Sequence, residues 1–315
     1  MKRLLCLAVI FVFVICCFSG CGTAQQSGDS LRVVTTIFPI YDWTSVISDG
    51  TDISLSMLMD GGVDMHSYQA TAADIMKVAS CDVLIYIGGV SDAWIEDAVR
   101  ESENPDLIVL NLMDVLGEAA LQEQTSEGMQ GEEEEQPEND EHIWLSLKNA
   151  QILVQAIADA LAQAAPEQAD TYAANAAEYI SQLAELDAAY TQMVAEAKRD
   201  TVVFGDRFPF LYMMNDYNIS WYAAFPGCSA ETEASFETVV YLADKVDELD
   251  LDAVLIIDGS DGSVADTIIR NTSDADRQVL TMHSLQSVTS RQARDGVTYL
   301  SLMRENLDVL AQALN

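Results

Sequence analysis

The chain has 315 residues, half of them apolar, so it can bury more core than one typical domain and suits two lobes. Its 51 Asp and Glu residues outnumber 15 Lys and Arg residues, which gives a formal net charge of −36. A polyanion of this size lacks the cationic surface that non-specific nucleic-acid binding needs, and it attracts cations instead. Composition alone does not separate cation capture from simple solubility.

The N-terminus predicts an export signal that is not part of the fold. A basic start precedes an apolar run over 4–18, which is too short for a comfortable membrane span. Small residues then lead to Cys21, as at a bacterial lipoprotein processing site, and a small, polar stretch follows. We therefore predict a lipoprotein signal peptide over 1–20, lipidation at Cys21 and a tether over 21–30. A plain secretory signal is the alternative.

The next part of the chain, 31–165, alternates strand-like and helix-like segments. Strands are predicted at 31–38, 53–58, 83–87 and 107–110, and helices near 40–48, 71–79, 92–101 and 147–164. This alternation indicates a parallel sheet covered by helices. The glutamate-rich stretch 118–141 interrupts it, and such a charge block predicts a disordered, solvated loop. Its run at 132–135 could gather cations weakly, although solvation is the favoured interpretation.

A single long helix is predicted over 166–198. Apolar residues recur there at steps of three and four, Pro166 suits the first turn, and no later glycine or proline bends the segment. About 33 residues at a rise of 1.5 Å would make a rod of about 50 Å. We assign 166–199 as a linking helix between the first lobe and a second lobe over 200–315.

The second lobe repeats the alternation. Strands are predicted at 201–205, 219–225, 253–258 and 278–282, and helices at 208–216, 235–249, 263–271 and 298–313. The predicted fold class is therefore α/β, with two parallel-sheet lobes joined by one long rigid helix. No sequence repeat relates the two lobes.

Only three histidines occur in the chain, and all three lie in loops near strand or helix ends. They are His66, His142 and His283, and Asp206 directly follows the strand at 201–205. Ligands of open α/β sheets bind outside the carboxyl ends of the strands, so two candidates from each lobe could meet in the cleft between them. Three imidazoles and one carboxylate suit tetrahedral zinc. No compact metal motif such as His-Glu-x-x-His is present.

Around these residues the chain resembles the metal-binding receptors of zinc and manganese ABC importers, which are solute-binding lipoproteins with a rigid linking helix. The resemblance covers nearly all of 31–315 and is carried by the motifs at 33–40, 62–68, 141–145 and 299–307. It implies an α/β fold of two lobes, a divalent metal as ligand, and an ABC permease as partner.

The resemblance also implies a ligand set. It carries His66 and His142 over as the first two ligands. Asp206 stands where the family has His or Glu, and His283 lies near the strand that supplies the fourth ligand, usually Asp or Glu. The chain further departs at Ser146, where the family usually shows Asp, and at Gln69, where it usually shows Glu. A glutamate-rich loop replaces the histidine-rich loop of many zinc relatives.

Each candidate has a plainer interpretation. His66 and His142 could cap a helix or bond a carbonyl, Asp206 could be the N-cap of the helix at 208–216, and His283 could be a surface loop residue. Cys228 could offer a thiolate to zinc, although a loop that shapes the cleft is favoured. Asp258 is a reserve ligand.

The sequence therefore predicts an extracytoplasmic, lipid-anchored and monomeric receptor, not an enzyme. It would bind one divalent ion, with zinc favoured over manganese, and pass it to a permease. Its affinity is expected to fall below about pH 6.5 as the histidines protonate. A secreted zinc hydrolase with Glu231 or Glu141 as base is one alternative. A receptor of the same architecture for a metal chelate is the other.

Overall fold

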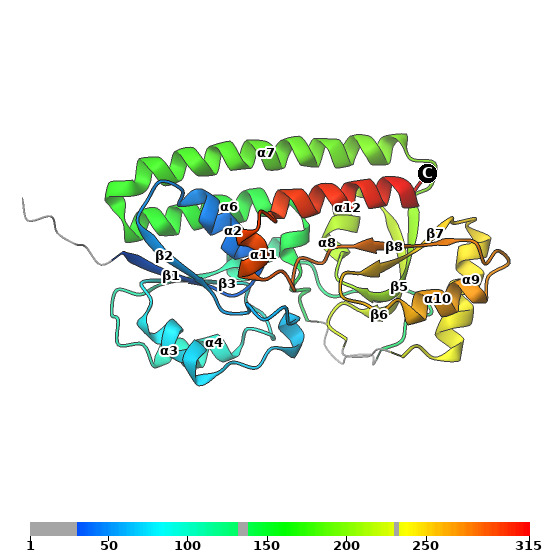
Figure 1. Ribbon diagram of the computed structural model, residues 1–315, viewed down its shortest axis with the longest axis horizontal. Coiled ribbons are helices and arrows are strands. Elements are labelled where there is room, and N and C mark those ends of the chain that lie inside the picture. The colour runs from blue at the N-terminus through cyan, green and yellow to red at the C-terminus, as the bar shows by residue number, and fades with distance from the viewer. Residues whose placement is uncertain (1–29, 132–137, 230–232) are drawn as a thin grey trace, which may run out of the picture. The chain divides into compact units, whose positions relative to one another are not determined.

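The computed structural model describes residues 30–131, 138–229 and 233–315, and Leu31–Asn315 form one compact unit (Figure 1). The predicted signal peptide, Cys21, nearly all of the tether and the run at 132–135 lie outside the described residues. None of the helices in the described part of the chain is both long and apolar enough to cross a membrane.

The first sheet has four parallel strands in the order β2-β1-β3-β4. They are β1 (Leu31–Thr35), β2 (Ile53–Met57), β3 (Val83–Tyr86) and β4 (Ile108–Asn111). The accompanying helices are α2 (Phe38–Ile47), α3 (Ala72–Ser80), α4 (Trp94–Arg100), α5 (Leu112–Leu116) and α6 (Leu147–Ala164). All of β3 is buried, as expected of a central strand covered on both faces. The predicted first strand runs too far, because Pro39 suits the first turn of α2.

The second sheet has the same topology, in the order β6-β5-β7-β8. Its strands are β5 (Thr201–Phe208), β6 (Ser220–Pro226), β7 (Ala253–Ile257) and β8 (Gln278–Met282). Its helices are α8 (Leu211–Tyr217), α9 (Phe236–Glu248), α10 (Ser263–Arg270), α11 (Ser290–Arg294) and α12 (Tyr299–Ala313). The strand order reverses between β1 and β3 in the first sheet and between β5 and β7 in the second. Open α/β sheets bind ligands outside the strand ends at such a reversal point.

The long helix α7 (Ala169–Glu196) follows a 3₁₀ turn, η4 (Pro166–Gln168), and passes both sheets in Figure 1. Its 28 residues make a rod of about 42 Å. It buries Tyr179 against the first lobe and Tyr190 against the second, where the Tyr190 hydroxyl donates to the Met303 carbonyl at 2.6 Å. The predicted fold class is thus confirmed: two parallel-sheet lobes are linked by one long helix.

The described parts of the acidic stretch, 118–131 and 138–141, expose many side chains, but they are also hydrogen-bonded to the second sheet. The Gln130 N–H donates to the Ala224 carbonyl at 2.8 Å, and the Ser126 hydroxyl accepts from the Ala223 N–H at 3.3 Å. Both partners belong to β6, the edge strand of the second sheet. The stretch therefore lies along the edge strand β6, which would otherwise be exposed. Charge composition alone cannot indicate this contact.

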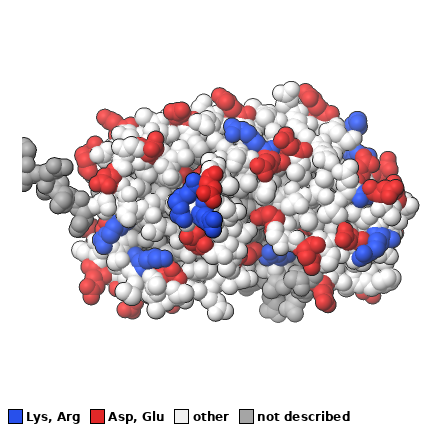
Figure 2. Space-filling view, viewed as in Figure 1, with Lys and Arg blue, Asp and Glu red and all other residues white. Residues whose placement is uncertain are grey.

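Acidic side chains are spread over the face shown in Figure 2, with fewer basic side chains between them. This distribution reflects the formal net charge of −36.

Candidate metal centre

His66 lies in the loop after β2, in the 3₁₀ turn η1 (Met65–Ser67). The Asp64 carboxylate begins this turn, because its Oδ1 atom accepts a hydrogen bond from the His66 backbone N–H at 2.9 Å. The ring is mostly buried, and its Nδ1 atom lies 2.9 Å from the Ser91 hydroxyl. The other ring nitrogen, Nε2, faces His142 Nε2 at 3.1 Å.

His142 is fully buried and directly precedes the turn η3 (Ile143–Leu145). Asp140 Oδ1 accepts from its backbone N–H at 2.8 Å and lies 3.1 Å from its Nδ1 atom. A carboxylate at Nδ1 holds the ring proton there and leaves the Nε2 lone pair for a metal. The neighbouring Trp144 fastens this segment to the second lobe, because its indole N–H donates to the Ser284 carbonyl at 2.9 Å.

Cys228 is the residue that the second lobe brings to this pair. Ligand atoms of His66, His142 and Cys228 all lie within 4.8 Å of one another. The thiol is half-buried and forms no disulfide. Gly227 allows the close approach, because a Cβ atom there would lie 3.0 Å from His142 Cε1 and 2.9 Å from the Phe208 carbonyl oxygen.

The two imidazoles differ in their electrostatics. Burial, reinforced by the neighbouring His142, lowers the pKa of His66 to about 3. Burial also acts to lower the pKa of His142, but the acidic neighbours, Asp140 foremost, together outweigh it and raise that pKa above 6.5. Burial and then acidic neighbours raise the pKa of the Cys228 thiol. His66 is therefore neutral at physiological pH, in the form that binds metals.

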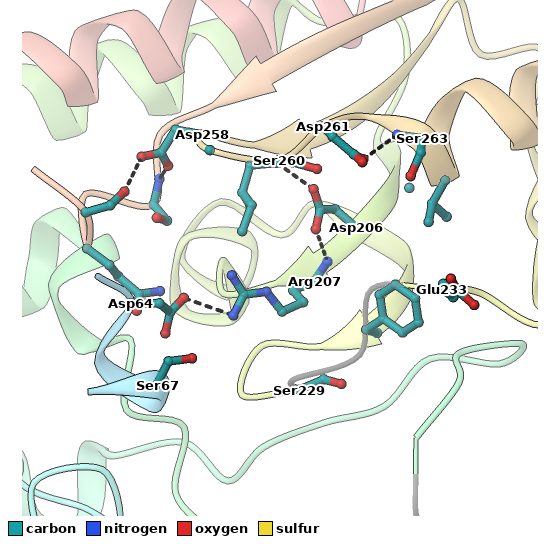
Figure 3. A pocket seen from close by; sticks show the side chains of 18 of the residues that line it. Asp64, Ser67, Asp206, Arg207, Ser229, Glu233, Asp258, Ser260, Asp261 and Ser263 are labelled. Atoms are coloured by element: carbon teal, nitrogen blue, oxygen red, sulfur yellow. Dashed lines mark hydrogen bonds and ion pairs between the residues drawn. The ribbon is translucent and has the colours of Figure 1, made fainter. Parts of the chain in front are cut away.

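Asp206 lies inside β5 rather than after it, because the strand continues to Phe208. Its Oδ1 atom accepts from the Arg207 N–H at 2.8 Å, and its Oδ2 atom accepts from the Ile257 N–H at 3.3 Å (Figure 3). It does not belong to the group of three ligand atoms. The alternative of an N-cap is excluded as well, since α8 begins at Leu211 with Phe210 as its N-cap.

A polar cavity lies beside the three-residue cluster and is shown in Figure 3. Its volume is about 610 Å³, and its walls come from both lobes. They include Ser67 and Ser229, the sequence neighbours of His66 and Cys228. Arg207 crosses between the lobes, with its Nη1 atom 2.9 Å from Asp64 Oδ2.

His283 is not brought to the histidine pair. It follows β8, but its Nε2 atom lies 3.0 Å from Glu305 Oε2 and its backbone N–H donates to Asn306 Oδ1 at 2.7 Å. Both partners belong to α12, so His283 is turned toward that helix. Asp258, the reserve candidate, accepts from the Ser284 N–H at 2.5 Å and from the Ser287 hydroxyl at 3.0 Å.

Sequence reasoning missed Ser91 and named Glu141 only as a possible base, although both lie beside His66 Nδ1. Ser91 and Glu141 are linked, because Glu141 Oε1 accepts from the Ser91 N–H at 2.9 Å, and Glu141 Oε2 lies 3.8 Å from His66 Nδ1. Gly89 makes room for this carboxylate, since a Cβ atom there would lie 2.8 Å from Glu141 Cδ. The glycine pair after β3 was the available signal.

Two lobes of one topology, a linking helix and a buried imidazole pair at the strand ends define a helix-linked binding protein with a candidate metal site. The chain belongs to the family described as ZnuA, the periplasmic component A of a zinc-uptake complex, whose sequence profile matches residues 33–313. The family predicted from the sequence motifs is thus confirmed.

Several relatives are named for zinc. A zinc-binding protein AdcA of Streptococcus pyogenes is 27% identical over 319 residues, which cover 98% of this chain and 61% of that protein. The chain thus spans about three-fifths of the length of the first curated relatives that it matches. The high-affinity zinc uptake system protein ZnuA of Bacillus subtilis is 25% identical, with 98% and 96% covered.

Solved structures agree on the fold. The Zn(II)-bound AdcA of Streptococcus pneumoniae has a TM-score of 0.73 and 25% identity, with 90% of this chain and 58% of that chain covered. The metal-dependent lipoprotein YcdH of Bacillus subtilis has a TM-score of 0.74 and 22% identity, with 91% and 100% covered.

Proposed function

We propose that the protein is an extracytoplasmic receptor that captures one zinc ion and delivers it to the permease of an ABC importer. The observation that carries this is the convergence of His66 Nε2 and His142 Nε2 at 3.1 Å. A buried imidazole whose other nitrogen is held by a carboxylate is the usual arrangement of a metal-binding histidine. The zinc-binding names of the relatives support the same ion.

The lipid anchor and the monomeric state are part of the proposal. Cys21 would carry the lipid and keep the receptor at the membrane face beside its permease. Labelled palmitate should enter the wild-type chain and not a Cys21→Ala variant, and the tether-less protein should elute as a monomer. Labelling of both chains alike would overturn the anchor.

The hydrolase alternative is less well supported. Of its two candidate bases, the structure describes only Glu141, whose Oε1 atom is already bonded to the Ser91 N–H. The family is one of metal-uptake components. A receptor for a metal chelate would use the same histidines, so it differs only in what else fills the cavity.

The test is metal titration of a chain that starts after Cys21, which keeps the whole compact unit Leu31–Asn315. Chelator-stripped protein should bind one equivalent of zinc tightly. His66→Ala and His142→Ala should each abolish this binding, whereas His283→Ala, which removes a histidine turned toward α12, should preserve it. Absence of stoichiometric zinc binding by the wild type would refute the proposed function.

A further inference from the structure

We propose that the second lobe supplies the Cys228 thiolate as a metal ligand, so that the centre has two nitrogens and one sulfur and favours zinc over manganese. This inference rests on the proposed function and specifies its chemistry. It replaces both second-lobe ligands expected from the sequence, Asp206 and His283.

The geometry is close to that of a zinc site. In a tetrahedral centre with usual Zn–N and Zn–S bonds, the ligand atoms lie roughly 3.3–3.7 Å apart. The two imidazole nitrogens are already 3.1 Å apart, and all three ligand atoms fall within 4.8 Å. A shift of roughly 1 Å in the thiol would therefore complete three corners of the tetrahedron.

The loop that carries Cys228 is built to bring it there. It leaves β6 at Pro226, and a turn closes with the Ser229 N–H donating to the Pro226 carbonyl at 3.2 Å. Gly227 places bare backbone against the His142 ring, as the Cβ distances above show. The next side chain in sequence, the Cys228 thiol, is thereby held at the imidazole pair.

Three nearby carboxylates, those of Asp64, Asp140 and Asp206, are bonded to other partners. Asp64 bonds the His66 N–H and the Arg207 guanidinium, and Asp140 bonds His142. Both oxygens of Asp206 accept backbone N–H groups of the second sheet. Among the described residues the thiol is thus the second-lobe group that reaches the two nitrogens.

A thiolate changes which metals the site accepts. Soft sulfur ligands favour zinc, whereas manganese favours carboxylate, carbonyl and water oxygens. On binding, the S–H bond is replaced by an S–Zn bond and the proton passes to solvent. We therefore expect zinc and cobalt to bind far more tightly than manganese.

The test uses cobalt as a spectroscopic probe in the chain that starts after Cys21, which leaves only Cys81 and Cys228 as thiols. Wild-type protein with one equivalent of Co²⁺ should show a thiolate-to-cobalt charge-transfer band in the near ultraviolet. Cys228→Ser should lose the band and should lose more zinc affinity than the roughly 10–100-fold that an outer-shell partner costs. It should also narrow the preference for zinc over manganese.

Cys81→Ala is the matched control, because Cys81 is buried beside β3 and its thiol contacts the Val78 carbonyl. It should keep both the band and the affinity, as should Asp206→Asn. Unfolding curves identify a variant that has lost its fold. The thiolate ligand would be overturned if Cys228→Ser kept full zinc affinity and the wild type showed no charge-transfer band. If His66→Ala still lost binding in that case, the proposed receptor function would stand. Wild-type protein that binds neither zinc nor cobalt would overturn both the thiolate ligand and the proposed receptor function.

Discussion

Replacing Gly227 by Ala tests whether the second-lobe loop presses on His142. The added Cβ atom would lie 3.0 Å from His142 Cε1 and 2.9 Å from the Phe208 carbonyl oxygen. Ordinary contacts begin near 3.4 Å, so the loop must retreat by about 0.4–0.5 Å. Overpacking of this kind costs about 1–3 kcal/mol. The part of this cost that only the metal-bound form bears should raise the zinc dissociation constant, by up to about 5- to 150-fold if the metal-free loop relaxes fully.

The assay is zinc titration in competition with a chelator, with thermal unfolding measured alongside. The melting temperature of metal-free protein should fall by about 2–4 °C for each kcal/mol lost. Gly61→Ala is a suitable control, because its nearest contact would be an ordinary 3.4 Å to Val63 Cγ2 in the loop that carries His66. A Gly227→Ala variant with unchanged affinity and unchanged melting temperature would refute the reasoning.

Further predictions concern the surroundings of the site and of the linking helix. Ser146→Asp should lower the free energy of unfolding by about 1–3 kcal/mol, although the resemblance to the family implies Asp at this position. Ser146 Oγ donates to Asp216 Oδ2 at 2.5 Å, so the substitution would bring two carboxylates together. Stabilisation in urea denaturation would contradict this prediction. Asp140→Asn should weaken zinc binding about 10–100-fold in calorimetry, since it removes the partner of His142 Nδ1; unchanged affinity would argue against it. Zinc affinity should fall as pH falls through neutrality, because the raised pKa of His142 lets protons compete; equal affinity at pH 8 and pH 5.5 would exclude this. Burial raises the pKa of Asp42 to about 6, so the ionised carboxylate destabilises the folded state. As the pH falls from 7 through 6 toward 4, this carboxylate is protonated and the free energy of unfolding should rise by up to about 3 kcal/mol. Asp42→Asn should lose that dependence in denaturant titrations at pH 5 and pH 7, and an identical dependence in both proteins would contradict it.

Most of the fold could be predicted because local patterns and tertiary packing agree. All eight predicted strands are present, and α7 buries the apolar residues that recur at steps of three and four, among them Ala176 and Leu183. The side chains of His66 and His142 meet because both segments lie at the carboxyl edge of the first sheet.

The second half of the candidate site could not be predicted, because hydrogen bonds distant in sequence decide it. Asp206 was expected beyond a strand, but β5 continues through it and the Ile257 N–H holds its carboxylate. His283 does follow a strand, yet Glu305 on α12 draws its ring away. The position of Cys228 depends on Gly227, because any side chain there would collide with the His142 ring. The sequence cannot show this, since the two residues are far apart along the chain.

The most direct test of the account is a crystal structure of the zinc-loaded protein with anomalous scattering recorded on both sides of the zinc absorption edge. We predict one strong peak between the lobes, at bonding distance from His66 Nε2, His142 Nε2 and Cys228 Sγ. A peak beside His283 and Glu305, or none near the imidazole pair, would contradict the account.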